Sequence, residues 1–304
     1  MKRPAGLIHV ILSLVCIIIF CLSLFELIYQ VTPVKKVFTE NAPITLKEEY
    51  VPELNYINSV SKLEAHTDSL YAEEAGGLST KRNLYPLILN DIVRKRFYHG
   101  LYRYSIGNNF VAYLFTKLSG RSWNEVWMAD DILKSTYAFC GQQALVEMNL
   151  LIKKGFPVRA VRMYSPSYND GHFAFEVFYD NDWHFFDPDM EPNASLLLQI
   201  GRPSVASLTS LIRTDKDILS VIYPHAPANK IFELFQNYKT GEENELMPAR
   251  SYLFASVTKI ISYAGWLLSL IVYLLYLRRY SFSFSRVVEF NKFRSEDKQP
   301  LPVI

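Results

Sequence analysis

A cysteine, a histidine and an aspartate occur in an order that suits nucleophilic catalysis. Cys140 opens a helix-like stretch, His172 opens a strand-like run, and Asp187 ends the next such run. Backbone N–H groups and the helix dipole at a helix start favour a thiolate. If the three side chains converge, Cys140 attacks a carbonyl, His172 carries the proton and Asp187 holds the imidazole. This chemistry proceeds through a thioester acyl-enzyme, and we expect no cofactor and no metal ion.

A hairpin must bring the imidazole and the carboxylate together. Alternate residues of a strand share a face. If the loop at Asp180-Asn181 has two residues, Ala174 lies opposite Asp187, and His172 is one diagonal step away on the same face. An odd loop without a bulge would send Asp187 to the other face. The sequence therefore predicts a two-residue turn.

Neighbouring acids and histidines leave alternatives open. Asp182 and Asp189 could replace Asp187, but Asp182 lies at the turn and Asp189 lies past the end of the strand. A metal site built from His172, His184 and Asp187 is a further alternative. Strand alternation puts His184 on the face opposite Asp187, so we expect His184 to be structural.

An oxyanion hole requires one more donor beside the backbone N–H of Cys140. Gln142, Trp123 and Trp127 are the candidates, and the sequence does not choose among them.

The elements around these residues predict an α+β fold. Residues 140–154 form the clearest helix of this region, with apolar residues on one face and Gly155 at its end. Glu176 is expected to pair with Arg159 or Arg162 across the sheet. The predicted strands are 158–164, 172–179 and 183–186. The other predicted helices are 83–98, 108–117, 122–134 and two or more between 204 and 246, two of which are separated by Pro224 and Pro227.

Four ordered segments resemble the transglutaminase-like cysteine superfamily. They are Cys140-Gly141-Gln142, residues 154–161 with the pattern GxPxR, residues 171–177 with HxxxEV, and residues 183–188 from Trp to Asp-Pro. The resemblance covers residues 135–192, about a fifth of the 304 residues.

That resemblance implies a papain-like fold in which a helix bearing Cys140 packs on an antiparallel sheet. It also implies a catalytic triad of Cys140, His172 and Asp187. The family contains amide-forming transferases, proteases, deamidases and inactive members, so it implies a fold more firmly than a reaction. This chain departs from the family at aromatic positions that carry no catalytic atom: Phe173, Phe175, Phe185 and Phe186.

Two uncharged apolar runs predict a membrane protein. Residues 5–25 and 260–277 lack Asp, Glu, Lys and Arg, and as helices they would be roughly 31 and 27 Å long. The first run is longer than a usual signal-peptide core and no A-x-A site follows it, so we favour an uncleaved anchor. Glu26, at the end of this run, could contact a partner or reach the interface.

Flanking charges predict the orientation. Lys2 and Arg3 precede the first run and a basic tail follows the second, whereas the segment between them is slightly acidic. Both termini are therefore expected in the cytoplasm and the central domain in the periplasm or outside the cell. The predicted organisation is an anchor at 1–30, a connector at 31–80, an extracytoplasmic domain at 81–250, a second transmembrane helix at 251–280 and a cytoplasmic tail at 281–304.

Composition excludes several classes of protein. With 32 Lys+Arg against 30 Asp+Glu, the formal charge is +2, which argues against a nucleic-acid binder. Three cysteines are too few for a disulfide scaffold. Half of the residues are hydrophobic, which excludes disorder of the whole chain.

The sequence thus predicts a membrane-anchored thiol enzyme that acts on an amide or peptide carbonyl of a protein or peptide, as a hydrolase or an acyl transferase. The alternative is a non-catalytic module of the same fold. It would bind a partner in an envelope or transport complex, with which the transmembrane helices would dock.

Overall fold

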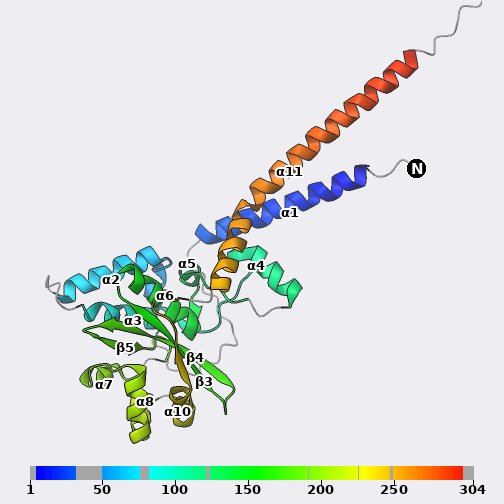
Figure 1. Cartoon of the computed structure of the whole chain (residues 1–304). Coiled ribbons are helices and arrows are strands. Elements are labelled where there is room, and N and C mark those ends of the chain that lie inside the picture. The colour runs from blue at the N-terminus through cyan, green and yellow to red at the C-terminus, as the bar shows by residue number, and fades with distance from the viewer. Residues whose placement is uncertain are drawn as a thin grey trace, which may run out of the picture. The chain divides into compact units, whose positions relative to one another are not determined.

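A computed structural model describes residues 5–31, 50–75, 82–120, 124–190, 192–224, 226–246 and 249–296. These residues form two units (Figure 1). The helical unit comprises helix α1 (Ala5–Val31), the first part of α4 (Ile106–Ser119) and most of α11 (Ala249–Glu296). The α+β unit comprises the other described residues.

The α+β unit is built on a four-stranded antiparallel sheet with the strand order β5-β4-β3-β6. The strands are β3 (Val158–Ser165), β4 (Asp170–Tyr179), β5 (Asp182–Phe186) and β6 (Tyr238–Thr240). Two short strands, β1 (Tyr98–His99) and β2 (Tyr137–Ala138), pair in parallel apart from this sheet. The prediction of an α+β class with an antiparallel sheet is confirmed.

Helices cover both faces of the sheet (Figure 1). Helices α2, α3 and α6 lie on one side, and α7, α8 and α10 lie on the other. Their bounds are α2 Val60–Ala75, α3 Leu84–Arg96, α5 Ala129–Ile132, α6 Cys140–Lys153, α7 Ala194–Gln199, α8 Val205–Thr214, α9 Ile218–Ile222 and α10 Ala228–Gln236. A 3₁₀ helix, η1, covers Pro52–Tyr56.

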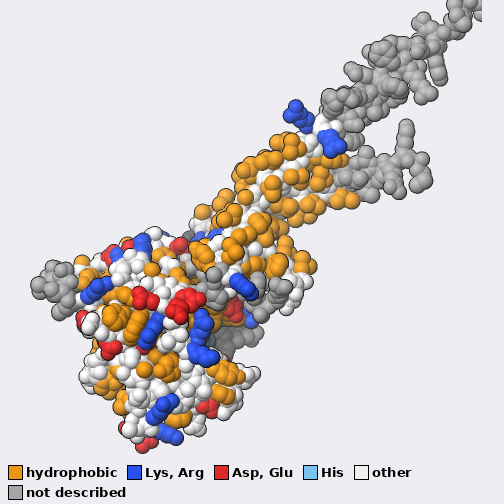
Figure 2. Space-filling view, viewed as in Figure 1, with side chains coloured by type: hydrophobic (Ala, Val, Ile, Leu, Met, Phe, Trp, Pro, Cys, Tyr) orange, Lys and Arg blue, Asp and Glu red, His pale blue; other side chains and the backbone are white. Residues whose placement is uncertain are grey.

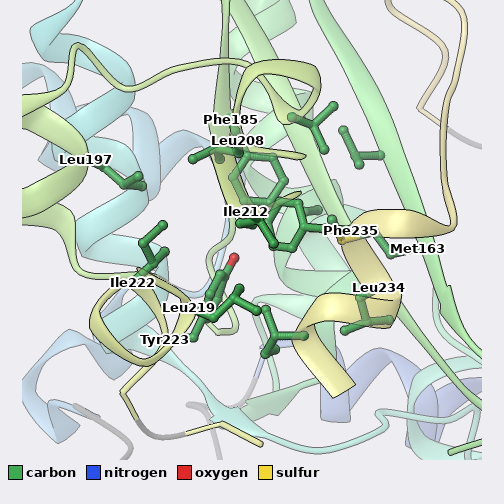
Figure 3. Packing of buried hydrophobic residues seen from close by; sticks show 14 residues of the cluster. Met163, Phe185, Leu197, Leu208, Ile212, Leu219, Ile222, Tyr223, Leu234 and Phe235 are labelled. Carbon is green, nitrogen blue, oxygen red and sulfur yellow. The ribbon is translucent and has the colours of Figure 1, made fainter. Parts of the chain in front are cut away.

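Helices α7–α10 and one face of the sheet enclose a hydrophobic core. Phe185 lies next to Phe235 of α10 in this cluster, with ring centroids 5.7 Å apart (Figure 3). Phe186, the next residue, points to the other face and stacks on Phe175. All of these rings are buried, so this part of strands β4 and β5 is covered on both faces.

The turn between β4 and β5 has two residues, as predicted. Asp180 and Asn181 have φ values of 48° and 68°, and Tyr179 pairs with Asp182. Positive φ at both central residues defines a type I′ turn, which Asn and Asp tolerate better than other non-glycine residues. The pairing register that brings His172 and Asp187 to the same face is therefore present.

The expected connector at 31–80 was wrong in its described part, because 50–75 belongs to the α+β unit and includes helix α2. Leu63 is buried, but charged side chains also hold α2. Lys154 lies 3.0 Å from Glu64 and 2.8 Å from Asp68, at the end of α6. Hydrogen bonds from Lys153 and Lys154 lower the pKa of Glu64. Ion pairs leave no apolar periodicity, which explains the error.

The helix expected at 122–134 is limited in the described residues to α5, Ala129–Ile132. Residues 124–126 instead run alongside residues 102–104: Tyr104 N donates to Asn124 O and Val126 N donates to Tyr102 O. Pairing with a distant segment overrides local helix preference here. Helix α7 and strand β6 were not predicted. Asn193 accepts a hydrogen bond from Leu196 N and caps α7.

Two helices are long and apolar enough to span a membrane, over residues Val10–Val31 and Arg250–Arg279. Hydrophobic side chains cover much of their visible surface (Figure 2). This agrees with the expected membrane association.

A polar cluster joins the three segments of the helical unit. Helix α4 breaks at Asn109, whose side chain then caps the second part by accepting from Ala112 N at 3.0 Å. Glu26 of α1 is fully buried and accepts from Phe110 N at 3.1 Å. From α11, Ser262 donates to Asn109 at 3.1 Å. Glu26 therefore has a role inside the chain, as an acceptor for a helix start that would otherwise lack one.

Replacing Glu26 should show how much the hydrogen bond from Phe110 N contributes to stability. Glu26→Leu leaves Phe110 N without its acceptor, so the free energy of unfolding should fall by about 1–3 kcal/mol. Glu26→Gln retains an acceptor oxygen and should lose less. Amide hydrogen exchange at Phe110 in the full chain in detergent measures the effect directly, and equal protection in both variants would contradict it.

The turn can be tested at Asn181. A valine there must adopt positive φ, which costs about 1–2 kcal/mol, whereas Asn181→Gly removes the strain and should leave stability equal or higher. Urea unfolding of the three chains measures the difference. A valine variant as stable as the glycine variant would show that the turn does not need its left-handed backbone.

Candidate active site

Cys140 is the first residue of α6, as predicted. Phe139 precedes it in extended conformation, and Gln142 N donates to Phe139 O. The next residue, Gly141, has an aromatic neighbour where a side chain would project: an added Cβ would lie 3.3 Å from the Phe139 ring. The sulfur therefore stands at a helix start, where amide dipoles favour negative charge.

His172 and Asp187 meet as the hairpin parity predicts. His172 Nε2 lies 2.8 Å from Asp187 Oδ2, and a carboxylate can only accept, so Nε2 donates. Tyr223 donates to the same oxygen at 3.3 Å, and Met190 N donates to Oδ1 at 2.9 Å. The carboxylate is fully buried and is held from several sides.

Cys140 hydrogen-bonds the same imidazole. Because Nε2 faces Asp187, the Nδ1 side of the ring is left for the sulfur. Burial of the ring opposes its protonation, but the charge of Asp187 and hydrogen bonds with Asp187 and Cys140 hold the pKa of His172 well above its usual value. The structure thus brings the three predicted residues together in one chain of contacts.

The trio of Cys140, His172 and Asp187 is largely buried. Cys140 and His172 each keep 8 % of their surface exposed. Strand β5 ends at Phe186, opposite Phe175, so the part of β4 that carries His172 extends past its neighbour. Next to His172, the edge of β4 is therefore not paired with β5, which leaves room for the start of α6.

The oxyanion candidates differ in their surroundings. Gln142 Nε2 donates to Tyr102 O at 2.7 Å and to Val126 O at 2.8 Å, so both of its N–H bonds are used. This argues against the expected oxyanion role, and Gln142 instead ties two loops to α6. Trp127 packs against Phe139 with ring centroids 5.8 Å apart and stays a candidate. Trp123 lies outside the described residues.

A second histidine and a second aspartate lie beside the trio. His99 Nδ1 lies 2.6 Å from Asp189 Oδ1, and Gln143 Nε2 donates to the same oxygen at 3.0 Å. Asp189 was considered only as a replacement for Asp187, and His99 was missed. A two-residue strand such as β1 leaves no periodic signal, so no pattern in the sequence pointed to His99.

These groups also decide where a metal ion could bind. Ligand atoms of Cys140, His172 and Asp189 all lie within 4.8 Å of one another. Cysteine, histidine and aspartate are all zinc ligands, so this trio could hold a zinc ion. The set considered from sequence differs: His184 binds Arg202 O and Tyr179 O instead, which agrees with its expected structural role.

Glu176 lies on the same face of the sheet as His172, because alternate residues of β4 share a face. Arg159 Nε donates to it at 2.6 Å, as expected, and Val205 N donates at 2.8 Å. The carboxylate thus links β3, β4 and the start of α8.

No family model, curated protein or solved structure matches this chain. The geometry of the site and the sequence pattern are therefore the guides to its function.

The raised pKa of His172 predicts a pH dependence of stability. The charged imidazole stabilises the fold fully below its unfolded pKa of about 6.5, and this contribution is lost as pH rises through the higher folded value. The stability difference between wild type and His172→Gln should therefore shrink as pH rises above about 6.5. Urea unfolding at pH 6 and at a series of higher pH values measures it, and a difference that does not change would contradict the charged pair.

Proposed function

We propose that this chain is a membrane-anchored thiol enzyme of the transglutaminase-like class, acting on an amide or peptide carbonyl of a protein or peptide. One observation carries the proposal: His172 contacts Asp187 on one side and Cys140 on the other. A buried histidine with only a structural role does not require a thiol at a helix start as a neighbour. It also does not require a carboxylate that accepts several hydrogen bonds, as Asp187 does. The α6 helix, the antiparallel sheet and the order of the motifs support a papain-like fold.

The arrangement suggests how the acylation step would proceed. The Cys140 thiolate attacks the carbonyl carbon and a C–S bond forms. His172 gives its proton to the departing amine as the C–N bond breaks. Asp187 holds the ring in place and stabilises its charged form. The N–H of Cys140 and one further donor stabilise the oxyanion, with Trp127 and Trp123 the remaining side-chain candidates.

Charge pattern and helices support the location. The two long apolar helices would anchor the chain in a cell or inner membrane. Positive-inside logic places both termini in the cytoplasm and the thiol domain on the other side. There, Cys140 would be the only thiol of the domain, because Cys16 and Cys21 lie in α1.

One observation favours a second candidate function. Only 8 % of the surface of Cys140 is exposed, as expected for a cysteine that packs rather than reacts. On that reading the same fold binds a partner, in an envelope or transport complex, and performs no chemistry. The two functions differ in the reactivity of the sulfur.

Alkylation by iodoacetamide at neutral pH distinguishes them. The chain should carry Cys16→Ser and Cys21→Ser, so that Cys140 is the remaining thiol. We expect rapid modification of the folded chain, slowed about tenfold or more in His172→Ala because the sulfur loses the imidazole that accepts its proton. His184→Ala is the matched histidine control. Modification only after unfolding, or at a rate independent of His172, would favour the binding module.

A further inference from the structure

A second carboxylate, that of Asp189, lies beside the sulfur and the imidazole of the candidate site. One ligand atom each of Cys140, His172 and Asp189 lies within 4.8 Å of the other two. Thiolate, imidazole and carboxylate are the groups that bind zinc in proteins. The acylation step uses Cys140 and His172 but has no use for Asp189. The place of this carboxylate therefore calls for a ligand other than the substrate carbonyl.

His172 is oriented as a metal-binding histidine is. Its Nε2 donates to Asp187 Oδ2 at 2.8 Å, which leaves Nδ1 on the side of Cys140. Histidines that bind a metal through one ring nitrogen almost always donate the other N–H to a carboxylate, a carbonyl or water, which fixes the tautomer. Asp187 is itself held by Met190 N and by Tyr223. The bond that orients the base for acylation thus also orients Nδ1 as a ligand.

Asp189 is held in place in the way that ligating carboxylates are. Gln143 Nε2 donates to its Oδ1 at 3.0 Å, and His99 Nδ1 lies 2.6 Å from the same oxygen. Hydrogen bonds of this kind orient a carboxylate ligand and are part of most metal sites. The side chain of Asp189 is only 2 % exposed, so water has little access to compete for it.

The amide of Gln143 supplies an acceptor at the same place. Its Nε2 donates to Ala138 O as well as to Asp189. Gln143 is 2 % exposed, and its Oε1 is buried and accepts no hydrogen bond from the described residues. With three protein ligands, the fourth position of a tetrahedral zinc ion goes to a water molecule, which has protons to donate. A buried acceptor without a donor, next to the carboxylate ligand, suits that water.

We propose that Cys140 Sγ, His172 Nδ1 and a carboxylate oxygen of Asp189 form a zinc site, with water as the fourth ligand. Thiolate and carboxylate together carry two negative charges, which Zn²⁺ cancels, so the occupied site suits its buried position. As the S–Zn bond forms, the proton shared by the sulfur and Nδ1 leaves to solvent. No electron is transferred.

Zinc bound here would reversibly inhibit the enzyme. It occupies the nucleophile and its base together, so the zinc-bound chain can be neither acylated nor alkylated at Cys140. This regulatory role rests on the proposed function, whereas the zinc site itself does not depend on it.

Cobalt tests the site without reference to activity. The untagged full chain with Cys16→Ser and Cys21→Ser is titrated in detergent with CoCl₂ and then with ZnCl₂. We expect a near-ultraviolet charge-transfer band from sulfur to cobalt, which must come from Cys140 because it is the remaining thiol. Zinc should abolish the band, because thiolate sites favour zinc.

Asp189→Asn is the deciding variant, because it removes the charge of the ligand and keeps the shape of the side chain. Loss of an outer partner of a metal site typically costs about 10–100-fold in affinity, so loss of a direct ligand should weaken zinc binding about tenfold or more. Isothermal titration calorimetry measures the affinity. Asp180→Asn, at the exposed turn between β4 and β5, is the matched control and should bind zinc as the parent chain does.

Iodoacetamide connects the site to the chemistry of the sulfur. The rate of Cys140 alkylation is measured in EDTA and at increasing zinc concentrations. We expect zinc to slow alkylation about tenfold or more, with half-protection of Asp189→Asn at a zinc concentration higher by about tenfold or more. Each variant is compared with its own rate in EDTA, which removes any difference in basal reactivity.

The outcomes separate the two proposals. Absence of the cobalt–sulfur band would overturn the zinc site and leave the proposed function standing. Equal zinc affinity in Asp189→Asn and the parent chain, or an equal loss in Asp180→Asn, would do the same. Alkylation that bound zinc does not slow would overturn the inhibitory role. Alkylation in EDTA only after unfolding would overturn the proposed function, while the cobalt band still decides the zinc site.

Discussion

The hydrogen bond between His172 and Asp187 depends on the register of a single hairpin. Strand β5 carries Phe185 and Phe186 side by side, and both rings are buried on opposite faces. A slip by one residue would exchange one phenylalanine for another, so hydrophobic burial alone does not specify the register. The turn at Asp180-Asn181 does specify it. Whether the imidazole has a carboxylate is therefore decided by two residues that tolerate positive φ.

The charges around the sulfur form a second constraint. Two carboxylates, Asp187 and Asp189, lie close to a group that must become negative, and like charges would oppose the thiolate. Each carboxylate is bonded to its own histidine. His172 balances charge at the nucleophile, and His99 bonds Asp189 on the more exposed side.

Much of the site could be predicted because its residues lie in local elements. The Cys140 helix, the two-residue turn and the parity of β4 and β5 all follow from short-range pattern. The rest depends on contacts between distant segments. Helix α2 is held partly by ion pairs to Lys153 and Lys154, and residues 124–126 pair with a segment twenty positions away. His99 reaches Asp189 through a two-residue ladder. Such contacts leave no period in the sequence.

All described residues of the candidate site, from His99 to Tyr223, belong to the α+β unit. The helical unit has its own polar cluster: Ser262 donates to Asn109, and Glu26 and Asn109 accept from backbone N–H groups of the broken helix α4. The hydrogen bonds of the candidate site and those of this polar cluster each lie within one unit. The turn and the start of α6 thus hold the thiol, the imidazole and the carboxylate together with residues of the α+β unit alone.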